Sequence, residues 1–354
     1  MTNAIVTGGA GFIGSSLVRR LKEQGANVVV IDALTYAACG GNLTGVIDDA
    51  ACRLIAGSIG DRALVGEILR TYRPDIVFNL AAETHVDRSI DLPEEFFATN
   101  VVQTASFLDV CQEYWRGLDK SARARFRIVH VSTDEVYGSL DEGQANENAP
   151  LQPNSPYAAS KAGGDMAVRS FQRTYDLPVA ITRGSNTFGP RQFPEKLIPR
   201  MILSALNGRS LPVYGDGRHE RDWMHVDDHV AGIIAVAERG RCGEIYNLGC
   251  GTGLANIDLV EALCAALDRV RPRADGGHYR DAIAFTADRP GHDRRYALDC
   301  RKAARELDWH PENTLPSALA ATIDWYLDHG DWWKPILDGQ YSLQRLGLID
   351  GVAT

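Results

Sequence analysis

The stretch that decides the fold is Thr7-Gly8-Gly9-Ala10-Gly11-Phe12-Ile13-Gly14, near the start of the chain. It follows a short β-branched run and opens an amphipathic stretch, so it predicts a tight strand-to-helix turn. Glycine has no Cβ, and this lets the backbone turn sharply and bring N–H groups against an anion at the helix N-terminus. By itself, the glycine spacing is also compatible with an ordinary turn between a strand and a helix.

An acidic residue at the end of the next expected strand separates these two interpretations. Asp32 lies where a carboxylate accepts hydrogen bonds from the ribose hydroxyls of a dinucleotide. The order strand, glycine turn, helix, strand and acid therefore predicts a dinucleotide-binding unit. Because a carboxylate at this position repels a 2′-phosphate, NAD is favoured over NADP.

The first half of the chain alternates short β-branched runs with longer amphipathic stretches, the pattern of βαβ units around a parallel sheet. Strands are expected at residues 4–7, 27–32, 53–56, 75–80, 127–132 and 179–182. Helices are expected at 12–24, 62–72, 94–114 and 155–175, with Gly25 as the C-terminal cap of the first. Six strands with five crossovers predict an α/β fold with a doubly wound, parallel Rossmann-type sheet.

Regular alternation stops after Gly184, where glycine and proline residues punctuate the chain. Further elements are expected at 244–248 (a strand) and at 257–268, 301–307 and 316–328 (helices). We therefore expect a smaller mixed C-terminal substrate lobe packed against the first. The predicted division is 1–186 for the NAD-binding domain, 187–330 mainly for the substrate lobe with segments returning to the first domain, and 331–354 for a C-terminal tail.

Composition excludes several functional classes. The 354 residues carry a formal net charge of −9 and an isoelectric point near 5.5, which opposes nucleic-acid binding and, taken alone, also argues against an anionic ligand. No long apolar run or secretory signal pattern is present, so we expect no membrane partner and a cytoplasmic location. The seven scattered cysteines predict reduced thiols, no disulfide and no cysteine zinc site.

Tyr157 and Lys161 are four residues apart in the helix expected at 155–175, so their side chains project from one helical face. To act as a base, a phenol must have its pKa lowered from ~10 toward ~7, which requires ~4 kcal/mol of differential stabilisation. A neighbouring ammonium and an oxidised nicotinamide ring can supply this jointly. The same spacing also fits an ordinary pair on a helix surface.

Three polar residues, Thr133, Asp134 and Glu135, follow the strand expected at 127–132. They are therefore placed at the carboxyl edge of the sheet, where open α/β sheets bind ligands. A hydroxyl beside Tyr157 completes a Thr–Tyr–Lys set that can remove a proton from an alcohol as hydride leaves. Two adjacent carboxyl groups can serve as acid and base if their surroundings separate their pKa values, although an Asp-Glu pair is also typical of an acidic turn or helix cap.

A second pair, His225 and His229, has the spacing of two metal ligands on a helix. We interpret residues 225–229 as a helix start with Asp caps, and we predict no metal.

Taken together, the motifs resemble the extended short-chain dehydrogenase/reductase superfamily and, within it, the dTDP-glucose 4,6-dehydratase family. The matching segments are 7–15, 79–89, 132–138, 155–162, 193–199, 221–223 and 287–297. The Thr-Asp-Glu run before Val136-Tyr137-Gly138 is characteristic of sugar-nucleotide dehydratases and separates the chain from the related 4-epimerases.

The resemblance implies conversion of dTDP-glucose to dTDP-4-keto-6-deoxyglucose, with tightly bound NAD that is regenerated at each turnover. Tyr157, assisted by Thr133, would take the C4 hydroxyl proton while hydride passes to NAD, and Lys161 would bind the nicotinamide ribose and lower the tyrosine pKa. Glu135 would then remove the C5 proton while Asp134 protonates the departing C6 oxygen. Finally, hydride would return to C6.

The resemblance also implies which residues bind the two ligands. Those expected at the cofactor are Gly8, Gly11, Phe12, Ile13, Gly14, Asp32, Ile59, Leu80, Ala81, Ala82, Thr99, Tyr157 and Lys161. Those expected at the nucleotide sugar are His85, Asn186, Lys196, Leu197, Tyr214, Arg221, Asn256, Arg289 and His292, with Tyr214 near the base. Helices 94–114 and 155–175 are expected to form the four-helix interface of a homodimer.

Several departures from the family pattern leave the nucleotide base open. Ser58 stands where relatives usually carry an Asp at the adenine, and Ala33 where some carry a Lys beside the ribose. The run 183–189 partly resembles UDP-glucose dehydratases, so UDP-glucose is the first alternative substrate. An epimerase or decarboxylase on the same fold, disfavoured by Asp134 with Glu135, and a catalytically silent dinucleotide sensor are the remaining rivals.

Overall fold

The computed structural model describes residues 2–47 and 50–339. Of the predicted tail, residues 340–354 lie outside the described part, and its beginning forms helix α13 (Gly330–Gly339).

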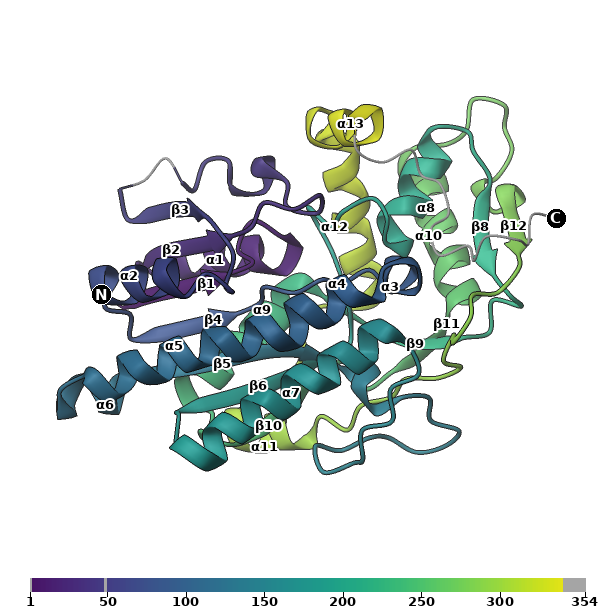
Figure 1. Cartoon of the computed structure of the whole chain (residues 1–354). Helices are drawn as coiled ribbons and strands as arrows, with labels where there is room; N and C mark the ends of the chain where they lie inside the picture. The colour runs from purple at the N-terminus through teal and green to yellow at the C-terminus, as the bar shows by residue number, and fades with distance from the viewer. Residues whose placement is uncertain (1, 48–49, 340–354) are drawn as a thin grey trace.

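A parallel sheet of seven strands forms the centre of the first lobe (Figure 1). Its order is β10-β6-β5-β4-β1-β2-β3, and every neighbouring pair is parallel. The strands are β1 (Asn3–Thr7), β2 (Asn27–Asp32), β3 (Cys52–Ala56), β4 (Ile76–Asn79), β5 (Arg127–Thr133), β6 (Val179–Gly184) and β10 (Ile245–Leu248). The strand order reverses between β1 and β4, which creates the crevice where sheets of this kind bind ligands.

The predicted doubly wound α/β fold is confirmed, but the expected six strands are one too few. Strand β10, expected within the second lobe, pairs with β6 so that Ile245 lies opposite Ile181. Its partner is more than sixty positions earlier in the chain, a non-local pairing that local sequence patterns do not show.

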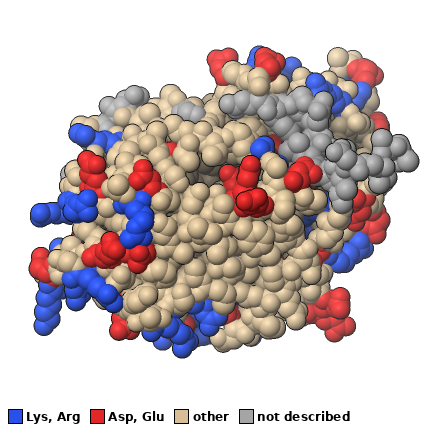
Figure 2. Space-filling view, in the orientation of Figure 1, with Lys and Arg blue, Asp and Glu red and all other residues tan. Residues whose placement is uncertain are grey.

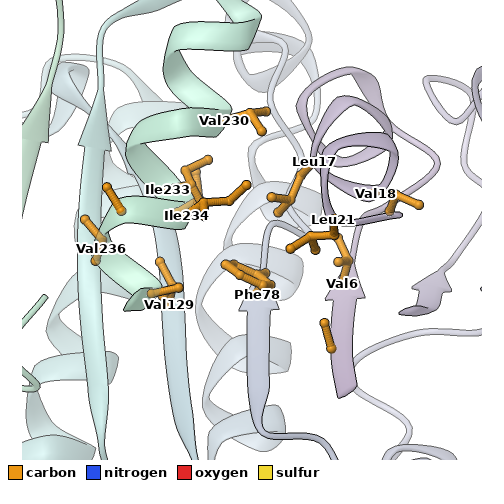
Figure 3. Close-up of a cluster of buried hydrophobic side chains, with 14 of the residues drawn as sticks. Val6, Leu17, Val18, Leu21, Phe78, Val129, Val230, Ile233, Ile234 and Val236 are labelled. Carbon is orange, nitrogen blue, oxygen red and sulfur yellow. The ribbon is translucent and has the colours of Figure 1, made fainter. Parts of the chain in front are cut away.

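Helices cover both faces of the sheet. On one face lie α1 (Phe12–Glu23) and α9 (Val226–Arg239), and α11 (Arg301–Leu307) packs against α9 and β10. Figure 3 shows Leu17 and Leu21 of α1 meeting Ile233 of α9 above Phe78 and Val129 of the strands. Each of these side chains is almost fully buried, and such burial stabilises the fold by ~1.5–3 kcal/mol per residue.

The opposite face is covered by α2 (Arg62–Tyr72), α5 (Thr104–Gly117) and α7 (Pro156–Tyr175), with α6 (Lys120–Arg125) following α5. The single helix predicted at 94–114 is wrong in detail. The segment is divided into α4 (Pro93–Phe97), a π-helical segment η2 (Ala98–Gln103) and α5, and α3 (Val86–Asp91) precedes it. Short π-helical segments are frequent at functional sites, and Thr99 and Gln103 of η2 both line the first cavity described below.

The second lobe carries its own hydrophobic core. It contains a sheet of β7 (Asn186–Phe188), β9 (Glu220–His225) and β11 (Gly253–Ala255), and a pair formed by β8 (Leu211–Tyr214) and β12 (Ile283–Thr286). Helices α8 (Leu197–Leu206), α10 (Asn256–Val270) and α12 (Leu315–Asp328) pack around Ile202, Leu263 and Ile323. The 3-10 turns of the chain are η1 (Gly40–Leu43), η3 (Asp134–Tyr137) and η4 (Tyr279–Ala282).

The start of α9 differs from the predicted Asp-capped start. Helix α9 begins at Val226, and the Nδ1 of His225 accepts a hydrogen bond from the N–H of Asp227 at 3.4 Å. Asp228 instead accepts hydrogen bonds from the backbone of Glu312 and Asn313, at 3.0 and 3.2 Å, and so ties a later loop to this helix.

In the described part of the chain, no helix is both long and apolar enough to cross a membrane. All seven cysteines belong to the described residues, and none of them is in a disulfide.

Candidate active site

A cavity of about 510 Å3 runs along the carboxyl edge of the central sheet, where the strand order reverses. Every residue predicted at the cofactor lines this cavity: Gly8, Gly11, Phe12, Ile13, Gly14, Asp32, Ile59, Leu80, Ala81, Ala82, Thr99, Tyr157 and Lys161. The structure therefore brings together positions that are up to 153 residues apart in the sequence.

The glycine turn leaves no space for side chains. Gly8 has a φ of +66°, which only glycine adopts readily, and a Cβ on Gly14 would lie 2.1 Å from the carbonyl oxygen of Gly8. Gly11 precedes α1 without any side-chain cap, and the first turn of α1 holds no acidic residue. The first N–H groups of this helix are therefore available to an anion such as a pyrophosphate.

Asp32 is buried at the end of β2 and lines the cavity. Its Oδ2 accepts a hydrogen bond from the N–H of Ala10 at 2.9 Å, and its Oδ1 accepts one from Leu34 at 2.8 Å. Burial raises the pKa of this carboxyl, and the two backbone hydrogen bonds act against that rise. Each oxygen keeps a second lone pair, so the geometry fits a carboxylate that accepts ribose hydroxyls.

Ser58, which departs from the family pattern, lies in the same cavity. Its hydroxyl donates a hydrogen bond to Oε1 of Gln103 at 2.9 Å and accepts one from the N–H of Gly60 at 3.0 Å. A Ser–Gln pair thus occupies the place where an acid was expected, and Gln103 was missed by the sequence reasoning.

The five predicted catalytic residues line this same cavity: Thr133, Asp134, Glu135, Tyr157 and Lys161. Strand β5 passes directly into η3, and the hydroxyl of Thr133 accepts the N–H of Glu135 at 3.3 Å while donating to Oδ1 of Asp134 at 3.2 Å. The Nζ of Lys161 donates to the carbonyl of Val131 at 2.8 Å. Helix α7 and the end of β5 are thereby held in a fixed relation.

Several groups of the protein act on the pKa of Tyr157. Burial raises that pKa above the ordinary value, the charge of Glu135 raises it further, and a hydrogen bond with Thr133 acts in the opposite direction. Burial also lowers the pKa of Lys161 to about 8, while Asp165, one turn along α7, raises it. An oxidised nicotinamide ring bound beside Tyr157 would add a positive charge that favours the phenolate.

The surroundings of the two adjacent carboxyl groups differ. Burial, Glu135 and Asp222 raise the pKa of Asp134 well above its ordinary value, and its buried Oδ2 has no hydrogen-bond partner among the described residues. Burial also raises the pKa of Glu135, but the charges of Arg289, Arg221 and Lys196 lower it. Asp134 is thus suited to donate a proton, and Glu135 to accept one.

Two further side chains support Glu135 and were missed by the sequence reasoning. The Tyr296 hydroxyl lies 3.4 Å from Oε2 of Glu135 and donates to Oδ2 of Asp293 at 2.7 Å. Asp293 also accepts a hydrogen bond from the side chain of Asn154 at 2.6 Å. Both residues belong to the segment 287–297, but nothing in the local sequence indicates a contact with a residue about 160 positions earlier.

A second cavity of about 180 Å3 adjoins the first and contains every residue predicted at the nucleotide sugar. These residues are His85, Asn186, Lys196, Leu197, Tyr214, Arg221, Asn256, Arg289 and His292. Glu135, Asn186 and Lys196 line both cavities, so a ligand in the second can reach the catalytic residues. Several buried polar atoms of the second cavity have no hydrogen-bond partner among the described residues, and Oδ1 of Asn186, Oδ1 of Asn256 and Nε of Arg289 are among them.

The second cavity gathers cations on an acidic protein. Arg221 and Arg289 are almost buried, and their side chains are held by the carbonyl of Asp293 at 2.8 Å and by Oδ1 of Asp87 at 3.2 Å. Asp87 also accepts a hydrogen bond from the Tyr214 hydroxyl at 2.9 Å. Guanidinium groups bind diphosphates well. The net negative charge of the whole chain therefore does not argue against an anionic ligand in this cavity.

Glu195 is a further residue that the sequence reasoning missed. It is buried between the two cavities, with Oε1 accepting from the Tyr36 hydroxyl at 3.1 Å and Oε2 lying 3.7 Å from Nε2 of His85. Burial raises the pKa of Glu195 to about 7. Burial and the nearby cations lower the pKa of His85 to about 2. Its place directly before Lys196 was the only signal available in the sequence.

Comparison with known proteins gives three consistent findings. The model of the family described as GDP-mannose 4,6 dehydratase matches residues 5–322. A dTDP-glucose 4,6-dehydratase of Xanthomonas campestris pv. campestris is 50% identical over 348 residues, covering 98% of this chain and 99% of the relative. A dTDP-glucose 4,6-dehydratase of Streptomyces venezuelae, solved with bound NAD, has a TM-score of 0.86 at 44% identity and covers 94% of this chain and 99% of its own.

Proposed function

Because this chain belongs to the nucleotide-sugar 4,6-dehydratase family, with dTDP-glucose 4,6-dehydratases among its relatives, we propose that it dehydrates dTDP-glucose to dTDP-4-keto-6-deoxyglucose. The observation that carries this proposal is the pair Asp134 and Glu135. The two carboxyls lie beside Tyr157 and Lys161, in surroundings that separate their proton affinities.

The first cavity fits NAD. The glycine turn and the start of α1 would hold its pyrophosphate, Asp32 the adenosine ribose, and Lys161 the nicotinamide ribose. When bound, NAD would accept a hydride from C4 of the sugar and return it to C6 as C5 is reprotonated. The carboxylate of Asp32 favours NAD over NADP, since a 2′-phosphate would meet a buried negative charge.

The residues of the chain would divide the proton transfers among themselves. Tyr157, hydrogen-bonded with Thr133, would take the proton from the C4 hydroxyl. Lys161, one turn along α7, would favour the phenolate through its positive charge. Oxidation at C4 acidifies the C5 proton, which Glu135 would remove. Asp134, kept protonated by its burial, would donate to the C6 oxygen so that it leaves as water.

The nucleotide diphosphate would occupy the second cavity. Arg221, Arg289 and Lys196 would bind its phosphates, and Tyr214 would lie near the base. We propose the thymidylyl sugar as the substrate. UDP-glucose is the alternative, because the run 183–189 differs from the form common among thymidylyl enzymes and partly resembles uridylyl dehydratases. An epimerase would not need Asp134 and Glu135, and a silent sensor would not need the whole catalytic set.

We also propose that the chain acts as a homodimer, joined through α4, α5 and α7. Figure 2 shows that the middle of the face occupied by these helices in Figure 1 carries few charged side chains, with charges around its edges. Exposed apolar side chains on or beside these helices support an interface there: Leu92, Phe97, Val102 and Met166 are 45%, 42%, 66% and 42% exposed.

The same proposal extends to the lobes and to the location. We assign residues 1–186 to the NAD-binding domain and 187–330 mainly to the substrate lobe. Helices α9 and α11 and strand β10 lie in the first lobe, which supports the proposal that later segments return to it.

We place the protein in the cytoplasm, a location with which its free thiols are consistent.

Mass spectrometry of the reaction mixture tests the proposed function. Purified protein with dTDP-glucose, and no added reductant, is expected to convert the substrate to a product lighter by one water. UDP-glucose in a parallel reaction is expected to react more slowly. If neither nucleotide sugar loses water, the proposed function is wrong, and faster conversion of UDP-glucose would transfer the assignment to the uridylyl substrate.

Sedimentation analysis tests the homodimer. The wild-type chain is expected to sediment as a dimer, and Val102→Glu as a monomer, because a charge would be buried in the interface. Phe285, 60% exposed in the second lobe, provides a matched control, since Phe285→Glu should leave the dimer intact. A monomeric wild type, or a Val102→Glu variant that stays dimeric, would contradict this interface.

A further inference from the structure

Behind the wall of the second cavity, three side chains form a compact cluster. The rings of His219 and His292 stack with centroids 3.6 Å apart and planes 15° apart. Asp288 joins them, with Oδ2 at 3.2 Å from Nε2 of His219 and Oδ1 at 2.6 Å from Nδ1 of His292. Of the three, only His292 lines the cavity, so His219 and Asp288 act on a ligand through His292.

The loops that carry the cluster are fastened to each other. His219 lies just before β9, while Asp288 and His292 follow β12. The N–H of Gly215 donates to the carbonyl of Thr286 at 2.9 Å, and Arg294 pairs with Asp216 at 2.9 Å. The carbonyl of His219 also accepts the N–H of Asn256, a residue of the second cavity, at 2.9 Å. The cluster is therefore a fixed part of the cavity wall.

The contact with Asp288 decides which nitrogen of His292 carries the proton. A carboxylate is an acceptor, so the Nδ1 of His292 that faces it carries the proton. Burial and the guanidinium groups of Arg289 and Arg221 lower the pKa of His292, and Asp288 opposes them. The neutral ring therefore keeps a lone pair on Nε2, and His292 lines the cavity.

His219 is kept neutral in a similar way. Burial lowers its pKa, and the charged groups that act on it are Asp288, Arg221, Arg294 and Asp216. It is only 5% exposed, and its Nε2 lies 3.2 Å from Oδ2 of Asp288. Its ring thus holds the second oxygen of Asp288 while covering one face of His292.

We propose that His219 is a positioning residue for nucleotide-sugar binding, which holds Asp288 and stacks on His292 so that Nε2 of His292 accepts a hydrogen bond from a hydroxyl of the ligand. This inference rests on the proposed assignment of the second cavity to the nucleotide sugar. Phosphate oxygens are acceptors and cannot donate to Nε2, so the contact selects a ribose or sugar hydroxyl and leaves the diphosphate to the arginines.

Three substitutions at His219 separate its two contacts. His219→Phe keeps the stacked ring but loses the polar contact of Nε2 with Asp288, and it is expected to raise the KM for dTDP-glucose ~5-fold, an effect typical of one lost polar contact. His219→Gln keeps a donor for Asp288, so its KM should lie within ~2-fold of the wild-type value. His219→Ala loses both contacts, so its KM should be higher than that of His219→Phe. In all three, kcat should stay within ~2-fold, because no reacting atom is touched.

A remote histidine provides the control. His278 makes the same kind of contact with Asp268, at 3.1 Å on an exposed loop, and His278→Phe should leave the KM unchanged. A fall in kcat without a change in KM for His219→Phe, or a KM that Gln does not restore, would overturn the positioning role.

Calorimetry with dTDP tests the protonation of His292. Titrations at neutral pH in two buffers of different ionisation enthalpy give the number of protons taken up on binding. Wild type and His292→Gln, which retains an acceptor, are expected to take up the same number, because a neutral His292 gains no proton. Uptake of one more proton by wild type would show an imidazolium against phosphate and would overturn the hydroxyl contact. If wild type binds dTDP but does not turn over dTDP-glucose, the proposed function fails and these titrations still decide the present inference.

Discussion

Replacing Asp134 by Asn should stop water loss and spare the oxidation that precedes it. The amide has nearly the same shape and keeps the hydrogen bond that Thr133 donates to Oδ1 at 3.2 Å, but it has no acidic proton. General acid catalysis contributes ~10²–10⁴-fold, or ~2.7–5.4 kcal/mol of the barrier. Because the carboxyl is fully buried and its Oδ2 has no partner among the described residues, solvent cannot easily supply the proton, and we expect the upper half of that range.

A single-turnover experiment measures both steps. Absorbance of the reduced cofactor reports oxidation at C4, which should change by less than ~3-fold because it depends on Tyr157 and Lys161. Mass spectrometry of quenched samples reports water loss, which should slow by ~10³–10⁴-fold. Asp141→Asn, the same substitution at an exposed position of a nearby loop, provides the control. If both steps slowed equally, or if water loss persisted, Asp134 would not be the acid.

The pH dependence of water loss should show the same division of roles, with Asp134 as the acid and Glu135 as the base. Asp134 works when protonated and its pKa is raised, so the rate should fall as the pH rises through that raised pKa. Glu135 works when ionised, and since its pKa is also raised, the acid limb should lie above 4.5, the ordinary value for a glutamate. Asp134→Asn should remove the alkaline limb alone, and a variant that kept both limbs would contradict the assignment.

Three other perturbations have defined outcomes. Glu135→Gln should slow water loss more than C4 oxidation, seen as accumulation of the reduced cofactor in single turnover, and a defect in oxidation alone would refute its role. Gly14→Ala places a Cβ 2.1 Å from a backbone oxygen, so it should lower the free energy of unfolding by ~1–3 kcal/mol, measured in urea, and reduce the NAD content of the purified protein. Gly117→Ala is the control and should change neither quantity, because a Cβ at Gly117 would have no atom within 4 Å. Arg183→Met removes the ion-pair partner of the buried Asp165, which lies 2.8 Å away, and should lower the free energy of unfolding by ~3–5 kcal/mol. Adding Asp165→Asn to this variant should recover much of the loss. If the double variant recovered nothing, the pairing argument would be refuted.

Local patterns predicted the elements that decide the fold. The glycine turn needs no long-range information, because a φ of +66° at Gly8 and the absence of space at Gly14 follow from the turn itself. The spacing of Tyr157 and Lys161 on α7 is likewise a property of one helix. The strand-order reversal then gathers the predicted residues at one edge of the sheet, which is why the cofactor residues line a single cavity.

Contacts between distant segments were out of reach of the sequence. Tyr296 reaches Glu135, and Glu195 lies between the cavities, only because the second lobe folds back over the sheet. The surroundings of Tyr157 depend on distant segments in the same way, because burial and the charge of Glu135 raise its pKa. A cluster such as His219 and Asp288 has no local pattern at all.

Isotope transfer within the sugar tests the central claim most directly. dTDP-glucose carrying deuterium at C4 would be incubated with the enzyme as purified, and the position of the label in the product read by nuclear magnetic resonance. A 4,6-dehydratase that uses Tyr157, Asp134 and Glu135 as described should deliver the deuterium to the C6 methyl group. Deuterium that remained at C4, as an epimerase would leave it, or that was lost to the solvent, would contradict this mechanism.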